Sequence, residues 1–157
     1  MKIFFVQTGK TTEKYIAEGI SLYEKRIKKF LPFKIITTTS LKSTRNLNPE
    51  EVKSREGKLL LDVLSKDDYV ILLDERGKEF TTAELASFVR RSFIVLRRNI
   101  VFVSGGAWGF SPEVYSRADM KLSLSKLTLP HQLVRLLFLE QLYRVLTLIE
   151  GIPYHHE

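Results

Sequence analysis

The chain contains 157 residues, of which 44% are hydrophobic and 27% are charged, and it carries a formal net charge of +7 at pH 7. This composition predicts one folded domain over residues 1–157 and excludes a disordered chain. The chain has no cysteine and only three histidines, which excludes a disulfide framework and leaves no metal site to expect. Without a long apolar run or a signal peptide, a soluble cytoplasmic protein with no membrane contact is expected.

The positive charge is concentrated in the first part of the chain. Residues 1–60 contain 13 Lys and Arg against 6 Asp and Glu, whereas residues 61–157 contain 12 of each kind. A regional surplus of this kind can neutralise phosphates, so nucleic acid is the first partner to consider, and a solvated basic helix face is the alternative. The basic residues of this region include Lys25, Arg26, Lys28, Lys29, Lys34, Lys42, Arg45, Lys53, Arg55 and Lys58.

The predicted elements in the first half of the chain alternate between strand and helix. Residues 2–7 form a β-rich run, and an amphipathic helix is predicted over residues 12–30, where apolar side chains recur at helical spacing. A second strand is predicted over residues 34–39. The polar stretch 41–48 is the expected flexible loop, and Pro49 begins a helix that runs to residue 64.

The second half of the chain continues this alternation. Three more strands are predicted, over residues 69–74, 100–104 and 120–124. Helices begin between them at Thr81, which opens a capping box, and at Ser111, an N-cap followed by proline, and a last helix runs from near residue 131 to about residue 149. Strands that alternate with helices pair in parallel, which predicts an α/β fold with a mostly parallel sheet sandwiched by helices.

Three segments that follow predicted strands are candidates for a ligand site: residues 74–78, 105–110 and 125–130. In open α/β sheets ligands bind outside the carboxyl ends of the strands, so we expect the three segments to lie at one edge. The Gly-Gly-x-x-Gly spacing in 105–109 lets the backbone approach a ligand, but it matches neither a dinucleotide fingerprint nor a P-loop. A strained turn is the alternative for the glycines, and a solvated charged turn for 74–78.

The last predicted helix is apolar on nearly every side and is therefore expected to be buried. His131 and Arg135 share one polar line on it, while Glu140, Arg144 and Thr147 share the opposite line. One arrangement that fits packs one flank on the sheet and another on a second copy of the chain, with the polar lines at the rims of a dimer interface. A solvated Glu140–Arg144 pair is the alternative.

Five motifs, in this order, give the chain a resemblance to a known family. The motifs are Leu73-Asp74-x-x-Gly77-Lys78, Phe102-Val103-x-Gly105-Gly106-x-x-Gly109, Leu122-Ser123-Leu124-Ser125-Lys126-x-Thr128-x-Pro130-His131-Gln132-x-Val134-Arg135, Glu140-Gln141-x-Tyr143-Arg144 and Gly151-x-Pro153-Tyr154-His155. With these motifs the chain resembles, over essentially its whole length, the RlmH family of bacterial ribosomal RNA large subunit methyltransferases of the SPOUT class.

The resemblance implies one SPOUT methyltransferase domain with a C-terminal trefoil knot, a homodimer, and S-adenosylmethionine as the cofactor. It further implies methylation of N3 of a pseudouridine in large-subunit (23S) ribosomal RNA on the assembled ribosome. RNA would lie across the first 60 residues of one subunit and reach the cofactor held by the other. The implied cofactor-binding residues are Leu73, Gly105, Leu124, Ser125, Lys126, Leu127, Thr128 and Leu129.

Methyl transfer to N3 requires that the proton on this nitrogen be removed, and His131, Arg135, Glu140 and Tyr154 are the candidate catalytic residues. His131 ranks first as the proton acceptor because histidine titrates near neutral pH. Arg135, Arg144 and Lys126 could stabilise negative charge on the uracil oxygens. The candidate RNA-binding residues are Lys25, Arg26, Lys28, Lys29, Arg144, His155 and His156.

Two other classes of protein remain as alternatives. A non-catalytic ribosome- or RNA-binding α/β module explains the basic charge but leaves the glycine segment unexplained. A nucleotide-binding domain of the flavodoxin type fits the order of elements, although no phosphate fingerprint is present. Hydrolase chemistry is disfavoured because the chain has no Gly-x-Ser-x-Gly motif and no nucleophile is spaced to pair with His131.

Overall fold

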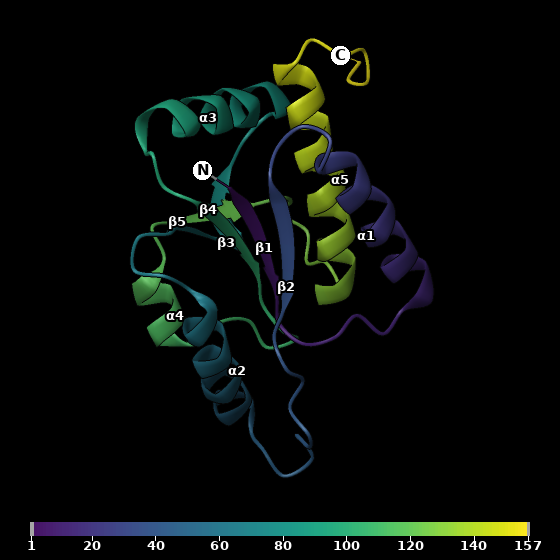
Figure 1. The fold of residues 1–157 in the computed structure, drawn as a ribbon. Helices are drawn as coiled ribbons and strands as arrows, with labels where there is room; N and C mark the ends of the chain where they lie inside the picture. Colours follow the sequence, from purple (N-terminus) through teal and green to yellow (C-terminus); the bar gives the residue numbers. More distant parts are fainter. Residues whose placement is uncertain (1, 157) are drawn as a thin grey trace.

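The computed structural model describes residues 2–156, which form a five-stranded sheet and five helices (Figure 1). The strand order is β2-β1-β4-β3-β5, and every neighbouring pair is parallel. The strands are β1 (Ile3–Gln7), β2 (Phe33–Thr37), β3 (Tyr69–Glu79), β4 (Ile100–Ser104) and β5 (Met120–Ser123), and the helices are α1 (Lys14–Ile27), α2 (Pro49–Val63), α3 (Thr82–Val95), α4 (Pro112–Arg117) and α5 (His131–Ile149).

Side chains alternate across the central strands and build a core on each face of the sheet. On one face, Phe5 and Phe102 pack with α1, α3 and α5. On the opposite face, Val6 packs in a second cluster with Leu60 of α2 and Val114 of α4. The ribbon shows α1 and α5 on one side of the sheet and α2 and α4 on the other (Figure 1). The predicted α/β fold, a parallel sheet between helices, is therefore confirmed.

The strand order decides against one of the alternatives. In a flavodoxin-type sheet the order is 2-1-3-4-5, so that the third strand lies between the first and the fourth. Here β4 lies beside β1, and β3 separates it from β5. The alternative of a flavodoxin-type domain is therefore wrong, although the order of elements along the chain is compatible with it.

Helix α5 fills the centre of one core. The ring centroid of Phe138 lies 4.9 Å from that of Phe5 and 4.6 Å from that of Phe102. Helices α1 and α3 of the same chain contact α5. The predicted position of its polar lines at the rims of a dimer interface is wrong for Arg135 and Thr147, because both side chains are fully buried within one chain.

Strand β3 is longer than predicted and includes the charged residues that follow residue 73. It pairs with β5 in two stretches, and the register shifts between Leu73 and Lys78. Residues 74–77 therefore form an irregularity within a strand rather than a turn, although Glu75 and Arg76 are exposed to solvent, as the alternative of a solvated charged turn assumed. Gly77 is required here, because a Cβ atom at this position would lie 2.6 Å from the backbone carbon of Lys121.

Polar side chains fix the helix starts that the sequence predicted. The side chains of Asn48, Thr81 and Ser111 each accept a hydrogen bond from a backbone N–H in the first turn of α2, α3 and α4. Helix α1 is shorter than the predicted 12–30 and has no such local cap. Instead, the side-chain oxygen of Gln132 accepts hydrogen bonds from the backbone N–H groups of Thr12, at 2.9 Å, and Glu13, at 3.3 Å.

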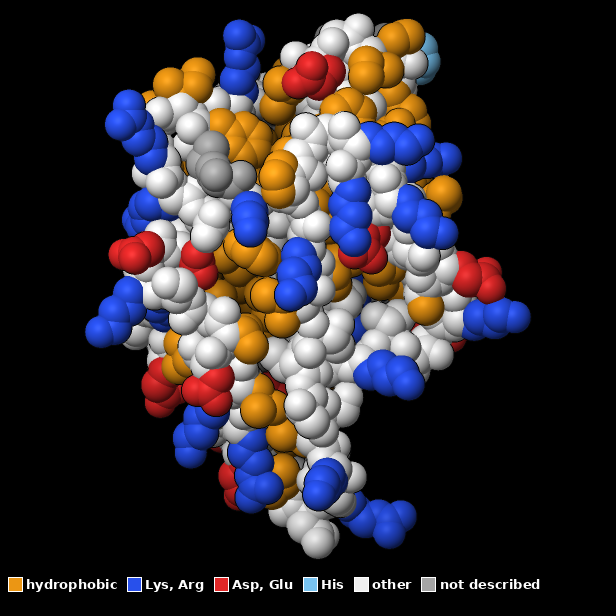
Figure 2. Space-filling view, viewed as in Figure 1, with side chains coloured by type: hydrophobic (Ala, Val, Ile, Leu, Met, Phe, Trp, Pro, Cys, Tyr) orange, Lys and Arg blue, Asp and Glu red, His pale blue; other side chains and the backbone are white. Residues whose placement is uncertain are grey.

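Basic side chains gather over the elements formed by the first part of the chain. Figure 2 shows Lys and Arg side chains over α1 and around the end of α2 that lies at the bottom of the view, where the 41–48 loop leads into it. Acidic side chains lie between them. None of the helices within residues 2–156 has the length and apolar character needed to cross a bilayer.

Candidate cofactor pocket

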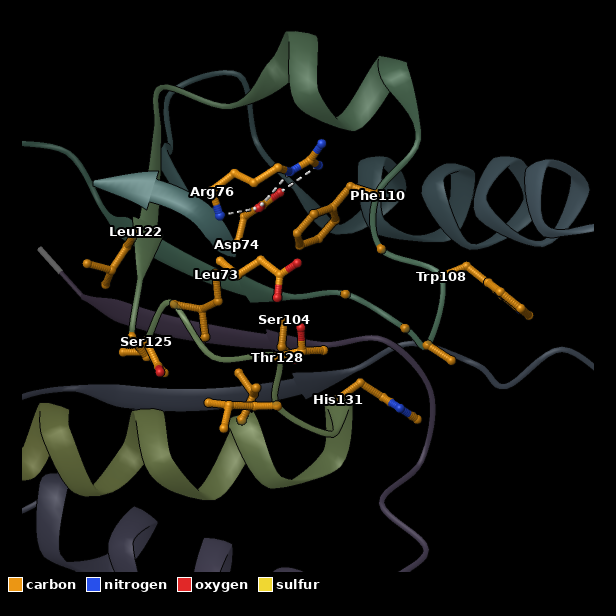
Figure 3. A pocket seen from close by; sticks show the side chains of 18 of the residues that line it. Leu73, Asp74, Arg76, Ser104, Trp108, Phe110, Leu122, Ser125, Thr128 and His131 are labelled. Carbon is orange, nitrogen blue, oxygen red and sulfur yellow. Dashed lines mark hydrogen bonds and ion pairs between the residues drawn. The ribbon is translucent and has the colours of Figure 1, made fainter. Parts of the chain in front are cut away.

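A cavity of about 400 Å³ lies where strands β3, β4 and β5 end (Figure 3). Its walls come from the three segments that the sequence singled out, so their predicted convergence at one edge is confirmed. The size falls within the range of about 300–1,000 Å³ typical of small-molecule sites. Seven of the eight residues that the resemblance assigns to the cofactor line the cavity, namely Leu73, Gly105, Leu124, Ser125, Leu127, Thr128 and Leu129.

Lys126 is the one residue of that set that does not line the cavity. Its side chain is 85% exposed, and its ammonium nitrogen lies 3.8 Å from a carboxylate oxygen of Glu79. The neighbouring loop is held by its own polar groups. Ser123 Oγ donates to the backbone oxygen of Ser125 at 2.9 Å, and Ser125 Oγ accepts from the backbone N–H of Leu127 at 2.9 Å. These hydrogen bonds hold this wall of the cavity in place.

The glycine loop supplies a second wall made largely of backbone. Gly106 and Gly109 form an isolated antiparallel bridge, and the N–H of Gly109 donates to the oxygen of Gly106 at 3.1 Å. Gly109 has a φ of +84°, a conformation that favours glycine. At Gly105, which lines the cavity, a Cβ atom would lie 3.3 Å from the ring of Phe110. The loop thus turns tightly and presents mainly backbone groups to a ligand in the cavity.

A network of Asp74, Arg76 and Tyr115 forms the third wall. The Tyr115 hydroxyl donates to Asp74 Oδ2, and Arg76 Nε donates to Asp74 Oδ1 at 3.3 Å. Burial favours a higher pKa for Asp74, but the hydrogen bonds from Arg76 and Tyr115 outweigh it and lower the pKa. Burial, followed by the hydrogen bond to Asp74, raises the pKa of Tyr115 to about 12. Near neutral pH this wall therefore pairs an ionised carboxylate with a neutral phenol.

His131 lies at the margin of the cavity, at the first residue of α5. Burial lowers the pKa of its imidazole, and the positive charge of Arg135 lowers it further. The imidazole is therefore neutral near pH 7 and is able to accept a proton. Its position and charge state fit the predicted role as a proton acceptor.

Arg135 does not line the cavity, although the sequence grouped it with His131. Its side chain is fully buried. The guanidinium donates to the backbone oxygens of Thr8 at 2.6 Å and Gly9 at 3.0 Å, and to Thr11 Oγ1 at 2.8 Å. These acceptors belong to the loop between β1 and α1, so Arg135 acts on this loop rather than on a ligand in the cavity.

The other predicted catalytic residues gather around the second half of α5. Arg144 Nη2 donates to Glu140 Oε1 at 2.5 Å, and the Tyr154 hydroxyl lies 3.3 Å from the same oxygen. A hydrogen bond with Tyr23, followed by burial, raises the pKa of Tyr154. Tyr154 is thus a neutral phenol that can orient a partner but is a poor proton acceptor. At 1.5 Å per residue, Glu140 lies about 13 Å beyond His131 along the helix.

Some of the predicted RNA-binding residues are exposed to solvent, and others belong to the cluster around Glu140. Lys25, Lys28, Lys29 and His156 are exposed, whereas His155 is half-buried. The Arg26 guanidinium lies 5.3 Å from the ring centroid of Tyr23 and 5.5 Å from that of Tyr143. Arg26 thereby joins the end of α1 to the segment that carries Arg144. The sequence analysis did not single out Tyr23 or Tyr143 as functional residues, although an arginine follows each of them within three residues.

Metal ligation has no support in the described part of the chain. Within residues 2–156, no three His, Asp or Glu side chains lie close enough together to hold a metal ion.

A parallel α/β sheet with a cavity between the loops at its strand ends defines the chain as an α/β protein with a small-ligand site. Residues 1–155 match the family described as "Predicted SPOUT methyltransferase", and the chain belongs to this family. The resemblance seen in the motifs is thereby confirmed.

Several relatives match the whole chain. It is 43% identical over 157 residues to the ribosomal RNA large subunit methyltransferase H of Phocaeicola vulgatus, with all of both chains covered. It is 41% identical over 157 residues to the protein of the same name from Parabacteroides distasonis, again with all of both chains covered. With the protein of this name from Cytophaga hutchinsonii the identity is 43% over 156 residues, which covers 99% of this chain and 100% of the relative.

Proposed function

We propose that this chain is an S-adenosylmethionine-dependent methyltransferase that modifies N3 of a pseudouridine in large-subunit ribosomal RNA of the assembled ribosome. The observation that carries the proposal is the cavity at the strand ends, because seven of the residues that line it are those that the family resemblance assigns to the cofactor. Membership of a methyltransferase family favours an enzyme over a non-catalytic RNA-binding module. The names of the relatives support large-subunit ribosomal RNA as the substrate.

The residues of the cavity fit an adenosine-containing sulfonium compound. Leu73, Leu122 and Leu124 offer apolar surface to a flat base, while the glycine loop and Thr128 offer backbone and hydroxyl groups for polar contacts. The donor, when bound, supplies a methyl group that is already activated by the positive sulfur. What remains for the protein is to hold the acceptor nitrogen in line with this methyl, about 3–3.5 Å away, and to remove its proton.

We assign removal of the proton to His131. It is the imidazole at the edge of the cavity, and its lowered pKa keeps it neutral and able to accept a proton near pH 7. Glu140, Arg144 and Tyr154 are assigned to the orientation of the RNA and to charge stabilisation on the uracil oxygens. Arg135 is assigned to positioning, because both terminal nitrogens of its guanidinium donate to the loop between β1 and α1.

A homodimer is part of this proposal. The separation of about 13 Å between Glu140 and His131 along α5 supports an arrangement in which the two residues of one site come from different subunits. Exposed apolar side chains such as Leu22 of α1 and Leu137 of α5 support a contact between copies on this side of the molecule. The RNA would then cross Lys25, Arg26, Lys28 and Lys29, together with Arg144, His155 and His156, to reach the other subunit's cavity.

The C-terminal trefoil knot of the SPOUT class and a cytoplasmic site of action are also part of this proposal. Residues 124–130 support the knot, because they lead from the edge strand β5 back to a helix that packs near the sheet centre and also line the cavity. This path places residues 124–130 beside the loops that follow β3 and β4. A knot at this point would hold the three segments together.

Transfer of labelled methyl from S-adenosylmethionine to ribosomes of a strain that lacks the endogenous enzyme tests the function. We expect one labelled position in the large-subunit RNA, at N3 of a pseudouridine, and calorimetric binding of the cofactor to the free protein. Binding of ribosomes without cofactor binding or methyl transfer would instead identify a non-catalytic module. Methyl transfer to another nucleotide would retain the enzyme and reject the assigned target.

A further inference from the structure

Trp108 is the single tryptophan of the chain, and its side chain is 58% exposed. Tryptophan side chains are highly buried on average, because transfer of the large ring out of water lowers the free energy. Within residues 2–156, none of the ring contacts involves this indole. The exposed ring therefore contributes little to the core, and its place in the structure needs another explanation.

The position of Trp108 connects it with the cavity. It belongs to the glycine loop that follows β4, and it lines the rim of the cavity together with Leu127, whose side chain is 74% exposed. Figure 3 shows that Trp108 points away from the cavity interior, toward the same side of the view as the His131 imidazole. The bridge between Gly106 and Gly109 closes the loop around it. The ring is thus presented outward from a tight turn.

We propose that Trp108 is an RNA-positioning residue whose indole face stacks on an unpaired nucleobase of the substrate, next to the nucleotide that enters the cavity. The inference rests on the proposed function. A base nitrogen can reach a methyl donor inside a cavity only when its nucleotide leaves the stack, and aromatic side chains commonly replace the lost stacking in unpaired RNA. An exposed indole at the rim, on the side of the proton acceptor, is suited to this task.

The ligand of the indole is the RNA rather than the cofactor. The cavity interior is already lined by Leu73, Leu122 and Leu124, whereas Trp108 points outward. Stacking on RNA bases depends on an aromatic face and tolerates different bases. Trp108 therefore affects the binding and placement of ribosomal RNA and leaves the affinity for the methyl donor unchanged.

Steady-state methyl transfer to ribosomes from a strain lacking the endogenous enzyme tests the inference with three variants. Trp108→Ala removes the ring, Trp108→Phe keeps an aromatic face, and Val95→Ala alters an even more exposed apolar residue on α3. We expect Trp108→Ala to raise KM for ribosomes about ten-fold or more, as loss of one stacked base predicts. The KM of Trp108→Phe should stay within about three-fold of the wild-type value, and the KM of Val95→Ala should equal the wild-type value. Equal KM values for Trp108→Ala and wild type would overturn the inference.

Because the chain has one tryptophan, its fluorescence reports on this residue alone. We expect assembled ribosomes, after subtraction of their own emission, to quench the emission of the wild-type protein and S-adenosylmethionine to leave it unchanged. Quenching by the cofactor alone, no response to ribosomes, or an emission spectrum that shifts when the protein is diluted, as dissociation of a second copy from the ring would produce, would each contradict the inference. If the wild-type protein methylates ribosomes but ribosomes do not quench its emission, the function stands and the role of Trp108 fails. If ribosomes quench the emission without methyl transfer, the proposed function fails instead.

Discussion

Arg135 Nη2 lies 2.6 Å from the backbone oxygen of Thr8 and donates a hydrogen bond to it, which ties the first turns of α5 to the end of β1. Thr8 Oγ1 in turn donates to the backbone oxygen of Ser104 at 2.8 Å, immediately before the glycine loop. The buried guanidinium is thereby linked through Thr8 to a wall of the cavity. A helix that begins with His131 is thus held in a fixed relation to the loop that carries Gly105.

Replacing Arg135 with Met should lower the free energy of unfolding by about 3–5 kcal/mol, because the three acceptors of its buried guanidinium lose their hydrogen-bond donor. Arg135→Lys should cost less, since an ammonium group keeps the charge and can reach one of these acceptors. Urea unfolding at pH 7 measures both. Arg91→Met on the exposed face of α3 is the control and should stay within about 0.5 kcal/mol of the wild type. An equally small effect of Arg135→Met would contradict a structural role.

Replacing His131 with Ala should lower kcat for methyl transfer by about 10²–10⁴-fold at saturating ribosomes, the usual contribution of a positioned acid–base group. KM for ribosomes should change little. Near-normal methylation by this variant at saturating RNA would show that another group takes the proton.

The pH dependence of the wild-type enzyme should reflect the lowered pKa of His131. A pKa below the usual 6.5 leaves the imidazole neutral at pH 7, so activity should hold steady down to about pH 6.5 and fall as the pH drops further through the folded pKa. NMR titration of the His131 ring protons measures this pKa directly. A midpoint above 6.5 would contradict the effect of burial and of Arg135.

Replacing Asp74 with Asn should destabilise the protein at pH 7, because Arg76 loses its anionic partner and the Tyr115 hydroxyl loses a charged acceptor. The pKa of Asp74 is lowered in the folded state, so its contribution is present above the usual value of 3.8 and is lost as the pH falls through the folded pKa. The difference between variant and wild type in urea midpoint should therefore shrink below pH 3.8. A difference that stays constant into this acid range would contradict the assignment.

Reversing the charge of Lys25, Lys28 and Lys29 to Glu should weaken ribosome binding and flatten its salt dependence. Each phosphate contact contributes about 0.7–0.9 to the slope of log K against log salt concentration, so loss of three contacts lowers the slope by about 2–3. The matched control reverses Arg90, Arg91 and Arg97, three exposed residues at and beyond α3, for the same change in net charge. If both triple variants lose the same slope, net charge rather than an α1 surface governs binding.

The sequence predicted the features that depend on local patterns. Pro49 marked the start of α2, and the capping residues Thr81 and Ser111 marked the starts of α3 and α4. The three strand-end segments could be recognised because parallel strands end at one edge. The motifs, rather than any physical pattern, connected this edge with a methyl donor.

Features that depend on contacts distant in the sequence were not predictable. A helical projection placed Arg135 on a polar line but could not show that Thr8 and Gly9, more than 120 residues earlier, supply its acceptors. Charged residues after Leu73 suggested a turn, because pairing with β5 across a register shift leaves no local signature. Tyr115 was overlooked for the same reason, since its partner Asp74 lies 41 residues away.

The place of Phe138 between Phe5 and Phe102 has a consequence for how the protein is made. A nascent chain that has been synthesised only as far as β5 has all five strands together with α1 and α3, but it lacks the helix whose Phe138 packs against these two rings. The same helix brings His131 and Val134 to the cavity, so the ligand site is completed only when α5 has left the ribosome. Chains interrupted before that point expose an apolar sheet face to aggregation or proteolysis and have no finished binding site.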